Sequence, residues 1–428
     1  MRILMVTQCF PPEMGALSHR MYPFARHLSI AGHEVSVATC LPNYPDGIVF
    51  EGYRGHRRLD QIDGGVRVLR TACYTAPRNQ RKLSQLRSYL SFVPAALRSG
   101  MRAGPVDVVF VTSPPLFPTI AAAMVASARR ARLVLDLRDL WPDEIVACGG
   151  ARDGSATVRA VRAIERWAYR RADAVCCTTE SFRDTVINRG ADARKVVLLP
   201  NGADVETFRP LPRINPVGAS LAPSDAIVVM YCGALGIKHG LGTVIDAAEK
   251  LRELHKLVFV LVGNGAARAQ LQQRVCAAGL TSVSFPGERP LHDLPFAMAR
   301  ADICVSSLLP EPYLEKIISV KVFEYLACAR PVVAAQSGET ARIVARSGGG
   351  LVVPPGDAGA FAAAVAELAA CPERRACMGE TGREYVVANY SRSVTARQLE
   401  RVLERVLRGA PQSPAGLEEG SRVEAVSA

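Results

Sequence analysis

The sequence predicts an α/β protein built from two facing, doubly wound Rossmann-like domains, each with a parallel sheet, and a cleft between the domains. Its 428 residues exceed the usual size of one domain and indicate two domains of roughly 200 residues each. Short runs of Val, Ile and Leu alternate with longer amphipathic segments, and the alternation restarts after a proline-rich stretch. Strands that are apolar along their whole length are typical of parallel sheets covered on both faces.

The N-terminal domain is expected over residues 1–205. Amphipathic helices are predicted at 17–31 and 157–171, between apolar segments of strand length. The predicted strands are 2–7, 34–40, 66–70, 106–112, 132–137, 173–178 and 195–200. This β-α-β alternation predicts a doubly wound sheet, whose ligand crevice lies at the carboxyl ends of the strands.

A second domain with the same alternation is expected over residues 223–390, after a proline-rich linker at 206–222. Its predicted helices are 241–254, 266–278 and 321–328. Its predicted strands are 226–232, 257–262, 283–285, 301–306 and 331–335. An amphipathic helix in the segment 391–408 could pack on either domain, crossing back to the first. Residues 409–428 are expected to form a disordered tail.

The composition excludes several classes of protein. Lys and Arg number 52 against 40 Asp and Glu, but no nucleic-acid-binding motif accompanies this basic surplus, so nucleic acid is not an expected partner. The 12 cysteines form no Cys-x-x-Cys pair and several lie in apolar strands, which is typical of a reducing cytoplasm. The longest apolar stretch, 116–128, is shorter than the roughly 20 residues of a membrane span.

Three loops that contain glycine follow predicted strands. Gly15 lies where a strand meets a helix, and the N–H groups and dipole of a helix N-terminus suit a phosphate. Gly233 opens a glycine-rich turn in which Lys238 could reach a diphosphate. Gly263 and Asn264 open a loop without the third glycine of a dinucleotide fingerprint, so NAD binding is not favoured. Each glycine could also serve only a tight turn.

Charged residues gather after the strand that ends at Ser306. Glu315, Lys321 and Glu324 lie around the start of a predicted helix, among apolar residues. A carboxylate can accept hydrogen bonds from two sugar hydroxyls, and a lysine near a helix N-terminus suits a phosphate. The alternative is a surface helix with solvated charges. We favour a partly buried polar site because of the apolar neighbours.

Arg138 and Asp139 directly follow the predicted strand 132–137, so both are expected to point toward the cleft. Trp141 is expected to be a packing residue. No Asp-x-Asp motif occurs, and the seven histidines show no ligand spacing. Neither a metal site nor a resident cofactor is therefore expected.

Several further motifs stand in order along the chain. They are Phe10-Pro11-Pro12-Glu13 with Gly15 and Arg20, Gly32-His33-Glu34-Val35, Pro42-Asn43-Tyr44-Pro45, Asp139-Leu140-Trp141-Pro142, Pro200-Asn201-Gly202 and Phe323-Glu324-Tyr325-Leu326-Ala327. Together they resemble glycosyltransferase family 4, of the GT-B fold, over residues 1 to about 407. More narrowly, they are similar to bacterial O-antigen and capsule transferases of L-fucosamine (N-acetyl-L-fucosamine).

The resemblance implies a retaining, metal-independent hexosyltransferase that uses a nucleoside-diphosphate sugar, usually UDP-linked, as its donor. Glu324 matches the family glutamate that holds the ribose hydroxyls. Glu315 is the best match to the glutamate near the donor sugar, at a spacing of nine positions instead of the common eight. Glu315, Asp139 and Arg138 are the candidate catalytic residues, with Asp139 orienting the acceptor or the donor.

The family often places an Arg and a Lys for the diphosphate in the glycine turn. Ala234 and His239 occupy those places here. Lys238 and Lys321, with the Gly15 loop, are expected to stabilise the charge on the leaving diphosphate instead.

The implied acceptor is a glycan, or a sugar on a polyprenyl diphosphate, in cell-surface polysaccharide synthesis. The segment 78–102 mixes apolar side chains with the basic residues Arg78, Arg81, Lys82, Arg87, Arg98 and Arg102. Such a segment could lie on an anionic membrane surface, or it could be an ordinary amphipathic helix packed on its own domain. The expected location is the cytoplasm, peripheral on the inner face of the plasma membrane.

Two other functions stay open on the same residues. A UDP-sugar epimerase of the same fold would bind the donor without an acceptor. A sugar-nucleotide-binding assembly protein without catalysis is the other alternative, because Ala234 and His239 depart from the family pattern.

Overall fold

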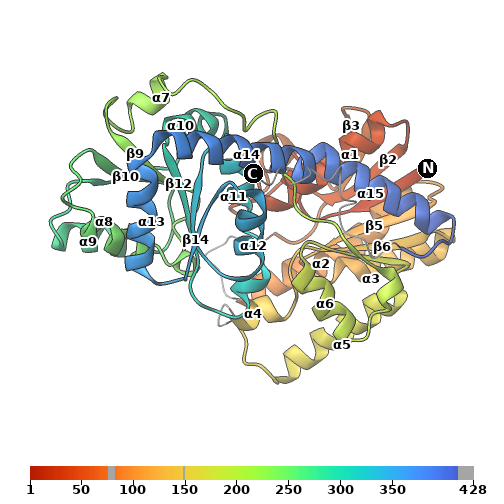
Figure 1. The fold of residues 1–428 in the computed structure, drawn as a ribbon. Helices are drawn as coiled ribbons and strands as arrows, with labels where there is room; N and C mark the ends of the chain where they lie inside the picture. Colours follow the sequence, from red (N-terminus) through yellow and green to blue (C-terminus); the bar gives the residue numbers. More distant parts are fainter. Residues whose placement is uncertain (76–81, 148–149, 413–428) are drawn as a thin grey trace. The chain divides into compact units, whose positions relative to one another are not determined.

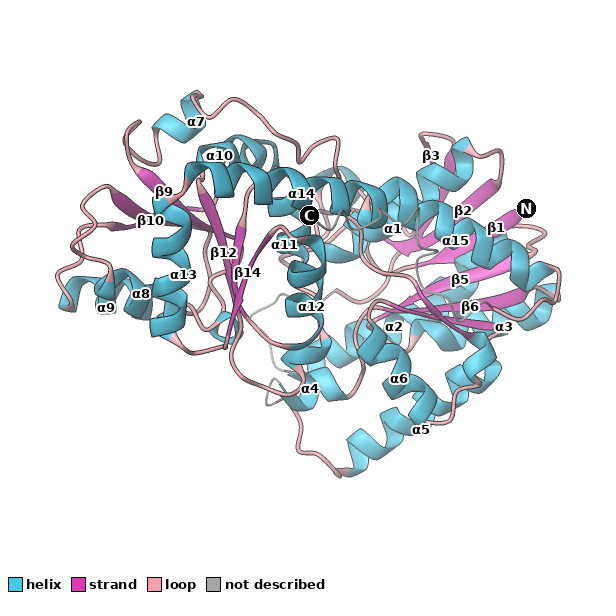
Figure 2. Cartoon of the chain, viewed as in Figure 1, coloured by secondary structure: helices cyan, strands magenta, loops and turns pink. Residues whose placement is uncertain are grey.

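The computed structural model describes residues 1–75, 82–147 and 150–412. The chain forms two compact units (Figure 1): unit 1 comprises the residues up to Asn201 together with those from Arg392 onward, and unit 2 comprises Gly202–Ser391. Each unit is a layered α/β structure around a largely parallel sheet (Figure 2). The predicted fold class, two Rossmann-like domains with parallel sheets, is therefore confirmed.

Unit 1 contains an eight-stranded sheet in the order β3-β4-β2-β1-β5-β6-β7-β8. Its strands are β1 (Arg2–Val6), β2 (Glu34–Cys40), β3 (Arg58–Asp63), β4 (Val66–Thr71), β5 (Val108–Ser113), β6 (Arg132–Leu137), β7 (Ala174–Cys177) and β8 (Val196–Leu198). The edge strand β3 pairs antiparallel with β4. The strand order reverses between β1 and β5, which places the expected ligand crevice at the carboxyl ends of those two strands.

The strand β3 was not predicted from the sequence. Gly64 and Gly65, with φ of 55° and 85°, form the tight turn between β3 and β4, and such left-handed pairs suit a two-residue hairpin. The side chains of β3 alternate between exposed and half-buried. An edge strand that lacks a buried face carries no continuous apolar run, and this explains the omission.

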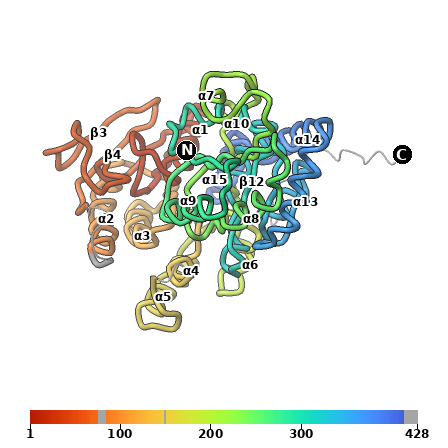
Figure 3. Tube along the Cα trace, turned by 90° about the vertical axis from the view of Figure 1, so that its left-hand side faces the viewer, coloured from red at the N-terminus to blue at the C-terminus, as the bar shows by residue number. Residues whose placement is uncertain are grey.

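Helices cover both faces of the unit 1 sheet. They are α1 (Ala16–Ile30), α2 (Lys82–Arg102), α3 (Pro118–Arg129), α4 (Asp143–Ala147), α5 (Ala156–Arg171), α6 (Glu180–Asn188) and α15 (Arg392–Leu407), with 3-10 turns at Glu51–Tyr53 and Ala193–Lys195. The helices α2 and α3 lie side by side (Figure 3). None of the helices within the described residues combines the length and apolar character of a membrane span.

The C-terminal helix α15 belongs to the core of unit 1, beside α1 (Figure 1). It buries Leu399, Val402 and Val406, whose spacing of three and four residues places them on one helix face. They pack in the same cluster as Phe24 of α1 and Met5 of β1. The structure thus settles which of the two units this amphipathic helix covers.

A buried ion pair joins α1 to the centre of the unit 1 sheet. Arg20 donates to both carboxylate oxygens of Asp136 on β6, from Nη2 at 2.7 Å and from Nε at 3.0 Å. Its remaining N–H groups bond the carbonyl oxygens of Leu199 and Pro200 at 2.9 Å each. Thr112 of β5 also donates to Asp136, at 3.0 Å. These bonds therefore hold α1, β5 and β6 together near the carboxyl ends of the strands.

Unit 2 contains a six-stranded sheet in the order β11-β10-β9-β12-β13-β14, and each neighbouring pair is parallel. Its strands are β9 (Ile227–Cys232), β10 (Leu257–Val262), β11 (Val283–Gly287), β12 (Ile303–Ser307), β13 (Val332–Ala335) and β14 (Gly350–Val353). Counted within the unit, the order is 3-2-1-4-5-6, the arrangement of dinucleotide-binding folds, with its reversal between β9 and β12. The short strand β14 was not predicted.

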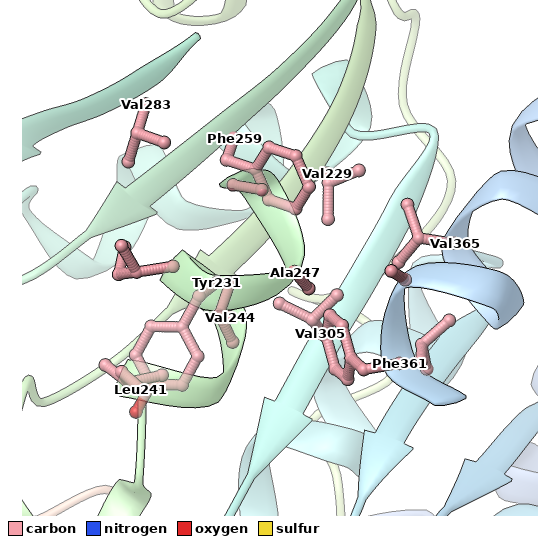
Figure 4. Close-up of a cluster of buried hydrophobic side chains, with 14 of the residues drawn as sticks. Val229, Tyr231, Leu241, Val244, Ala247, Phe259, Val283, Val305, Phe361 and Val365 are labelled. Atoms are coloured by element: carbon pink, nitrogen blue, oxygen red, sulfur yellow. The ribbon is translucent and has the colours of Figure 1, made fainter. Parts of the chain in front are cut away.

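The helices of unit 2 are α7 (Pro216–Ala219), α8 (Gly242–Lys250), α9 (Arg268–Ala277), α10 (Leu294–Arg300), α11 (Val320–Ala327), α12 (Gly338–Ser347), α13 (Ala358–Ala370) and α14 (Pro372–Tyr390). Short 3-10 turns occupy Ile237–His239, Leu291–Asp293 and Leu314–Lys316. Phe361 and Val365 of α13 pack with Val305 of β12 and Val229 of β9 in the apolar cluster of Figure 4. The segment predicted as a linker contains α7, and Arg213 there bonds Asp302 at 3.0 Å.

We expect Asp136→Asn to destabilise unit 1 by about 3–5 kcal/mol, because it leaves the Arg20 guanidinium buried without its counter-charge. Both tryptophans, Trp141 and Trp167, lie in unit 1, so their fluorescence during urea denaturation reports its unfolding. The matched control is Asp60→Asn. Asp60 pairs on the surface with Arg67, at 3.4 Å, and with Arg102, and its replacement should change the free energy of unfolding by less than about 1 kcal/mol. Equal losses in the two variants would contradict the assignment.

Candidate active site

The carboxyl ends of β9 and β12 meet where the strand order of unit 2 reverses. The loop after β9 and the loop after β12 are joined there, because the Leu309 N–H donates to the Lys238 carbonyl at 3.0 Å. The Ser307 hydroxyl also donates to the Gly240 carbonyl, at 3.3 Å. In sheets of this kind a ligand binds at this point, and the predicted residues Gly233, Lys238 and Lys321 lie in the elements that follow these strands.

Two predicted glycines allow the loops after β9 and β10 to touch. Gly263 has a φ of 136°, and a Cβ atom there would lie 2.0 Å from the Gly233 carbonyl oxygen. The Gly233 N–H donates to Val262, and the Leu235 N–H donates to the Asn264 carbonyl at 2.8 Å. The Asn264 side chain in turn accepts from the Gly265 N–H at 2.9 Å. The two loops thus form one backbone surface that no larger residue could build.

Lys321 lies over this surface from the first turn of α11. Its ammonium donates to the Tyr231 hydroxyl at 2.7 Å and approaches His239 Nδ1 at 3.4 Å. Its Cε lies 3.1 Å from the place that a Cβ on Gly233 would occupy, so the glycine makes room for the lysine. Burial lowers the pKa of Lys321 to about 7.

His239 is close to Lys321, but it supplies no positive charge. Burial, together with the charges of Lys321 and Lys238, lowers its pKa to about 3, so the ring is neutral at physiological pH. Lys238 is exposed in the same 3-10 turn. The structure therefore brings Gly233, Lys238 and Lys321 together, as a phosphate site requires. Tyr231 was not predicted, because no signal in its own strand marks it.

The two glutamates lie in different elements. Glu324 is half-buried on α11, three residues after Lys321 and hence on the same helix face. Glu315 is exposed in the 3-10 turn before α11, where its carboxylate accepts from the Ser337 hydroxyl at 2.9 Å. That hydroxyl belongs to the N-cap residue of α12. Their roles at the ribose and at the donor sugar stay predictions.

Unit 1 has a cavity at the carboxyl ends of its central strands. Cys9 after β1, Tyr44 after β2, Pro114 after β5 and Arg138 after β6 contribute to its walls. Gly15 caps α1 close by, with an extended backbone. A Cβ on Gly15 would lie 2.8 Å from the Tyr44 ring, so this glycine allows the ring to pack on the start of the helix. The phosphate role of Gly15 stays a prediction.

Arg138 and Asp139 occupy the predicted position directly after β6. The Arg138 N–H donates to the Ser113 carbonyl at 2.9 Å, and its carbonyl accepts from the Thr178 hydroxyl at 3.2 Å. Burial lowers the pKa of the Arg138 guanidinium. Asp139 is half-buried beside it. Trp141 also lines the cavity, with its ring edge-to-face on Tyr89 at 5.6 Å, so it does more than pack in the core.

Glu13 shapes the cavity, although its role was not predicted. It is fully buried, and its carboxylate accepts from the N–H groups of Phe10 at 3.1 Å and of Asn43 and Tyr44 at 2.9 Å each. These bonds connect the loops after β1 and β2. The motifs that contain Glu13 and Asn43 were visible in the sequence, but their mutual contact was not.

The segment proposed for a membrane surface forms α2 in its described part. Arg78 and Arg81 lie outside the described residues. The helix buries Phe92, Ala95 and Ser99 against its own unit and exposes Leu86 and Leu90. Packing on the unit is therefore established, and the membrane role stays a prediction.

Comparison with known proteins agrees with this architecture. Residues 15–202 match the glycosyl transferase 4-like domain, and residues 226–371 match the glycosyl transferases group 1 domain. WcaI of Escherichia coli (strain K12), which is named as a colanic acid biosynthesis glycosyl transferase, is 29% identical over 67% of this chain and 71% of its own. A GDP-mannose-dependent alpha-mannosyltransferase of Mycobacterium tuberculosis is 25% identical over 83% of this chain and 84% of its own.

Solved structures show the same fold. The sucrose-phosphate synthase of Thermosynechococcus elongatus aligns with a TM-score of 0.73 at 20% identity, over 96% of this chain and 100% of that one. Anabaena Alr3699/HepE in complex with UDP aligns with a TM-score of 0.68 at 19% identity, over 94% and 100%. The class is therefore a glycosyltransferase of the GT-B fold. The two matched domains and the relatives together indicate a hexosyltransferase.

We expect Gly263→Ala to destabilise unit 2 by at least about 2 kcal/mol, because the methyl group would collide with the Gly233 carbonyl at a backbone angle that side chains rarely adopt. Differential scanning calorimetry of the full chain measures the loss. Gly236→Ala is the matched control, because Gly236 has a φ of −88° and a Cβ there would lie 3.5 Å from the nearest atom, in the His239 ring. A control variant as unstable as Gly263→Ala would contradict the collision.

Proposed function

We propose that the chain is a retaining, metal-independent glycosyltransferase that takes its sugar from a nucleoside-diphosphate donor and extends a cell-surface polysaccharide. The observation that carries the proposal is the position of Lys321. Its ammonium lies over the joined glycine loops at the strand-order reversal of unit 2, on the same helix face as Glu324. A cation, open backbone and a carboxylate are what a diphosphate and a ribose need.

In this proposal Lys321 and Lys238 stabilise the negative charge that develops on the leaving diphosphate. Glu324 accepts hydrogen bonds from the ribose hydroxyls, and Glu315 contacts the donor sugar. The acceptor enters unit 1, where Asp139 orients it. The acceptor attacks the donor sugar on the same face from which the diphosphate leaves, so the configuration of the anomeric carbon is retained. The sugar could be an N-acetylated amino-deoxy hexose such as L-fucosamine, as the motif resemblance implies.

UDP is the first candidate for the nucleotide, because Anabaena Alr3699/HepE was solved with UDP. GDP is the second candidate, since several relatives are named as GDP-mannose-dependent transferases. A glycan or a polyprenyl-diphosphate-linked sugar is the proposed acceptor. WcaI, named for colanic acid biosynthesis, supports the assignment to polysaccharide synthesis. The proposed location is the cytoplasm, at the inner face of the plasma membrane.

A sugar-nucleotide-binding protein without catalysis is a second candidate function. The neutral His239 and the small Ala234 occupy places where the resemblance expects cations, which favours this alternative. Binding of UDP without turnover on any acceptor would support it. An epimerase would instead release an epimeric donor without free UDP.

We expect Glu324→Ala to lose nucleotide binding by a factor of roughly ten or more, because the ribose hydroxyls lose a charged acceptor. Calorimetric titration of UDP, GDP and NAD into the wild type and the variant measures the loss. Glu249→Ala, a half-exposed carboxylate of α8 paired with Arg252, is the matched control and should bind as the wild type does. Binding of NAD alone would overturn the transferase assignment.

We expect the affinity for UDP to fall as the pH rises above 7.5. The pKa of Lys321 is about 7 in the free protein, so the lysine is largely neutral at higher pH and must take up a proton to bind a diphosphate. The terminal phosphate of UDP, with a pKa of about 6, is already ionised in this range. Affinity should fall by up to roughly tenfold per pH unit, a limit set by one coupled proton.

Calorimetry in two buffers with different ionisation enthalpies measures the proton uptake directly. Lys321→Met should weaken binding and remove the uptake. Lys238→Met should weaken binding but leave the uptake in place, because the exposed Lys238 is not the coupled group. Equal UDP affinity of the wild type at pH 7.5 and pH 9 would refute the role of Lys321.

A further inference from the structure

The cavity of unit 1 has the composition of a sugar-binding site. Trp141 and Tyr89 form an aromatic wall, edge-to-face at 5.6 Å, and Tyr44 contributes a third ring. Flat aromatic faces pack well against the C–H face of a sugar ring. Asn43 and Ser88 add amide and hydroxyl groups that can bond sugar hydroxyls. These aromatic, amide and hydroxyl groups could bind a neutral sugar without any charged residue.

Arg138 adds a positive charge to this wall. Its guanidinium has no hydrogen-bond or ion-pair partner among the residues that the structure describes, and its Nε atom is buried without an acceptor. Arg138 itself is half-buried, and the two fully buried arginines of unit 1 differ from it. Arg20 has Asp136 and two carbonyl groups, and Arg70 has Gln61 and the carbonyls of Cys40 and Pro11.

The charges of Asp139, Asp136 and Glu144 act on Arg138, but none of these carboxylates forms an ion pair with it among the described residues. Asp136 is fully occupied by Arg20 and Thr112. Glu144 lines the same cavity, but it forms no ion pair with Arg138 in the described structure. Because a guanidinium stays protonated, its partial burial without a counter-charge is unfavourable, and a ligand that brings an anion would offset that cost.

We propose that this cavity selects acceptor sugars that carry an oxyanion, a phosphate or a carboxylate, and that Arg138 is the residue that selects them. The proposal rests on the proposed function, in which the acceptor enters unit 1. The planar guanidinium can hold two oxygens of either group at once. The aromatic wall holds the ring of the same sugar, so the two contacts together define the acceptor class.

Trp141 provides the readout for a direct test. The chain has 2 tryptophans, so the full-length Trp167→Phe variant reports on Trp141 alone. We would titrate this protein with hexose 1-phosphates, with hexuronic acids and with neutral methyl hexosides, each in the gluco, galacto and manno forms. The expected result is a saturable change of Trp141 emission, with at least one anionic sugar binding roughly tenfold tighter than its neutral counterpart.

Variants in the Trp167→Phe background assign the preference. Arg138→Gln should remove it, and Arg138→Lys should keep part of it. Arg87→Gln is the control: this arginine stacks on Tyr74 at 5.0 Å, outside the cavity lining, and should leave the preference unchanged. Thermal melts of each variant check the fold. Comparing the affinities for hexose 1-phosphates and for hexuronic acids then shows whether the cavity prefers a phosphate or a carboxylate.

The outcomes separate this proposal from the donor assignment. Equal binding of charged and neutral sugars, an unchanged preference in Arg138→Gln, or no saturable signal from any probe would overturn it. Loss of UDP and GDP binding in Arg138→Gln would also overturn it, because the arginine would then serve the donor. If the wild type bound neither nucleotide but kept the Arg138-dependent preference, the proposed function would fail and the oxyanion site would stand.

Discussion

A positively charged side chain that is removed from water needs hydrogen-bond or ion-pair partners in the protein. This requirement explains the arrangement around the key cations of both units. In unit 1, Arg20 meets it completely, with two bonds to Asp136 and two to the carbonyls of Leu199 and Pro200. These bonds set the carboxyl ends of β6 and β8 against α1. The position of Arg138, two residues after Asp136, follows from the same pair. Arg138 therefore lies in a well-fixed part of the fold, although its guanidinium has no bonded partner among the described residues.

Lys321 meets this requirement differently in unit 2. Its partners are a phenol and a neutral imidazole, which accept hydrogen bonds but bring no negative charge. The pKa of the lysine falls to about 7 as a result of burial, so the free site holds its charge only in part. Tyr231 and His239 thus place the ammonium without neutralising it. A bound diphosphate would supply the negative charge that these two neutral partners of Lys321 lack.

The sequence was sufficient for those features that repeat locally. Strands such as 34–40, 132–137 and 257–262 were predicted at their observed bounds, because continuous apolar runs mark buried parallel strands. The edge strand β3 lacked such a run. Lys321 and Glu324 could be predicted as a pair on one helix face, three residues apart. The contact of Lys321 with Tyr231, 90 residues away, depends on strand order, which no local pattern encodes.

The two cations differ in a way that suits their proposed partners. A lysine with a pKa near 7 can gain its proton when a diphosphate arrives and lose it when the nucleotide leaves, so its charge follows occupancy. An arginine cannot give up its proton, so Arg138 presents a constant charge to whatever enters the cavity. Reversible charge fits a product that must be released after each transfer. Permanent charge fits the selection of an acceptor, because the hydroxyls of a neutral sugar can accept hydrogen bonds from the guanidinium but bring no counter-charge.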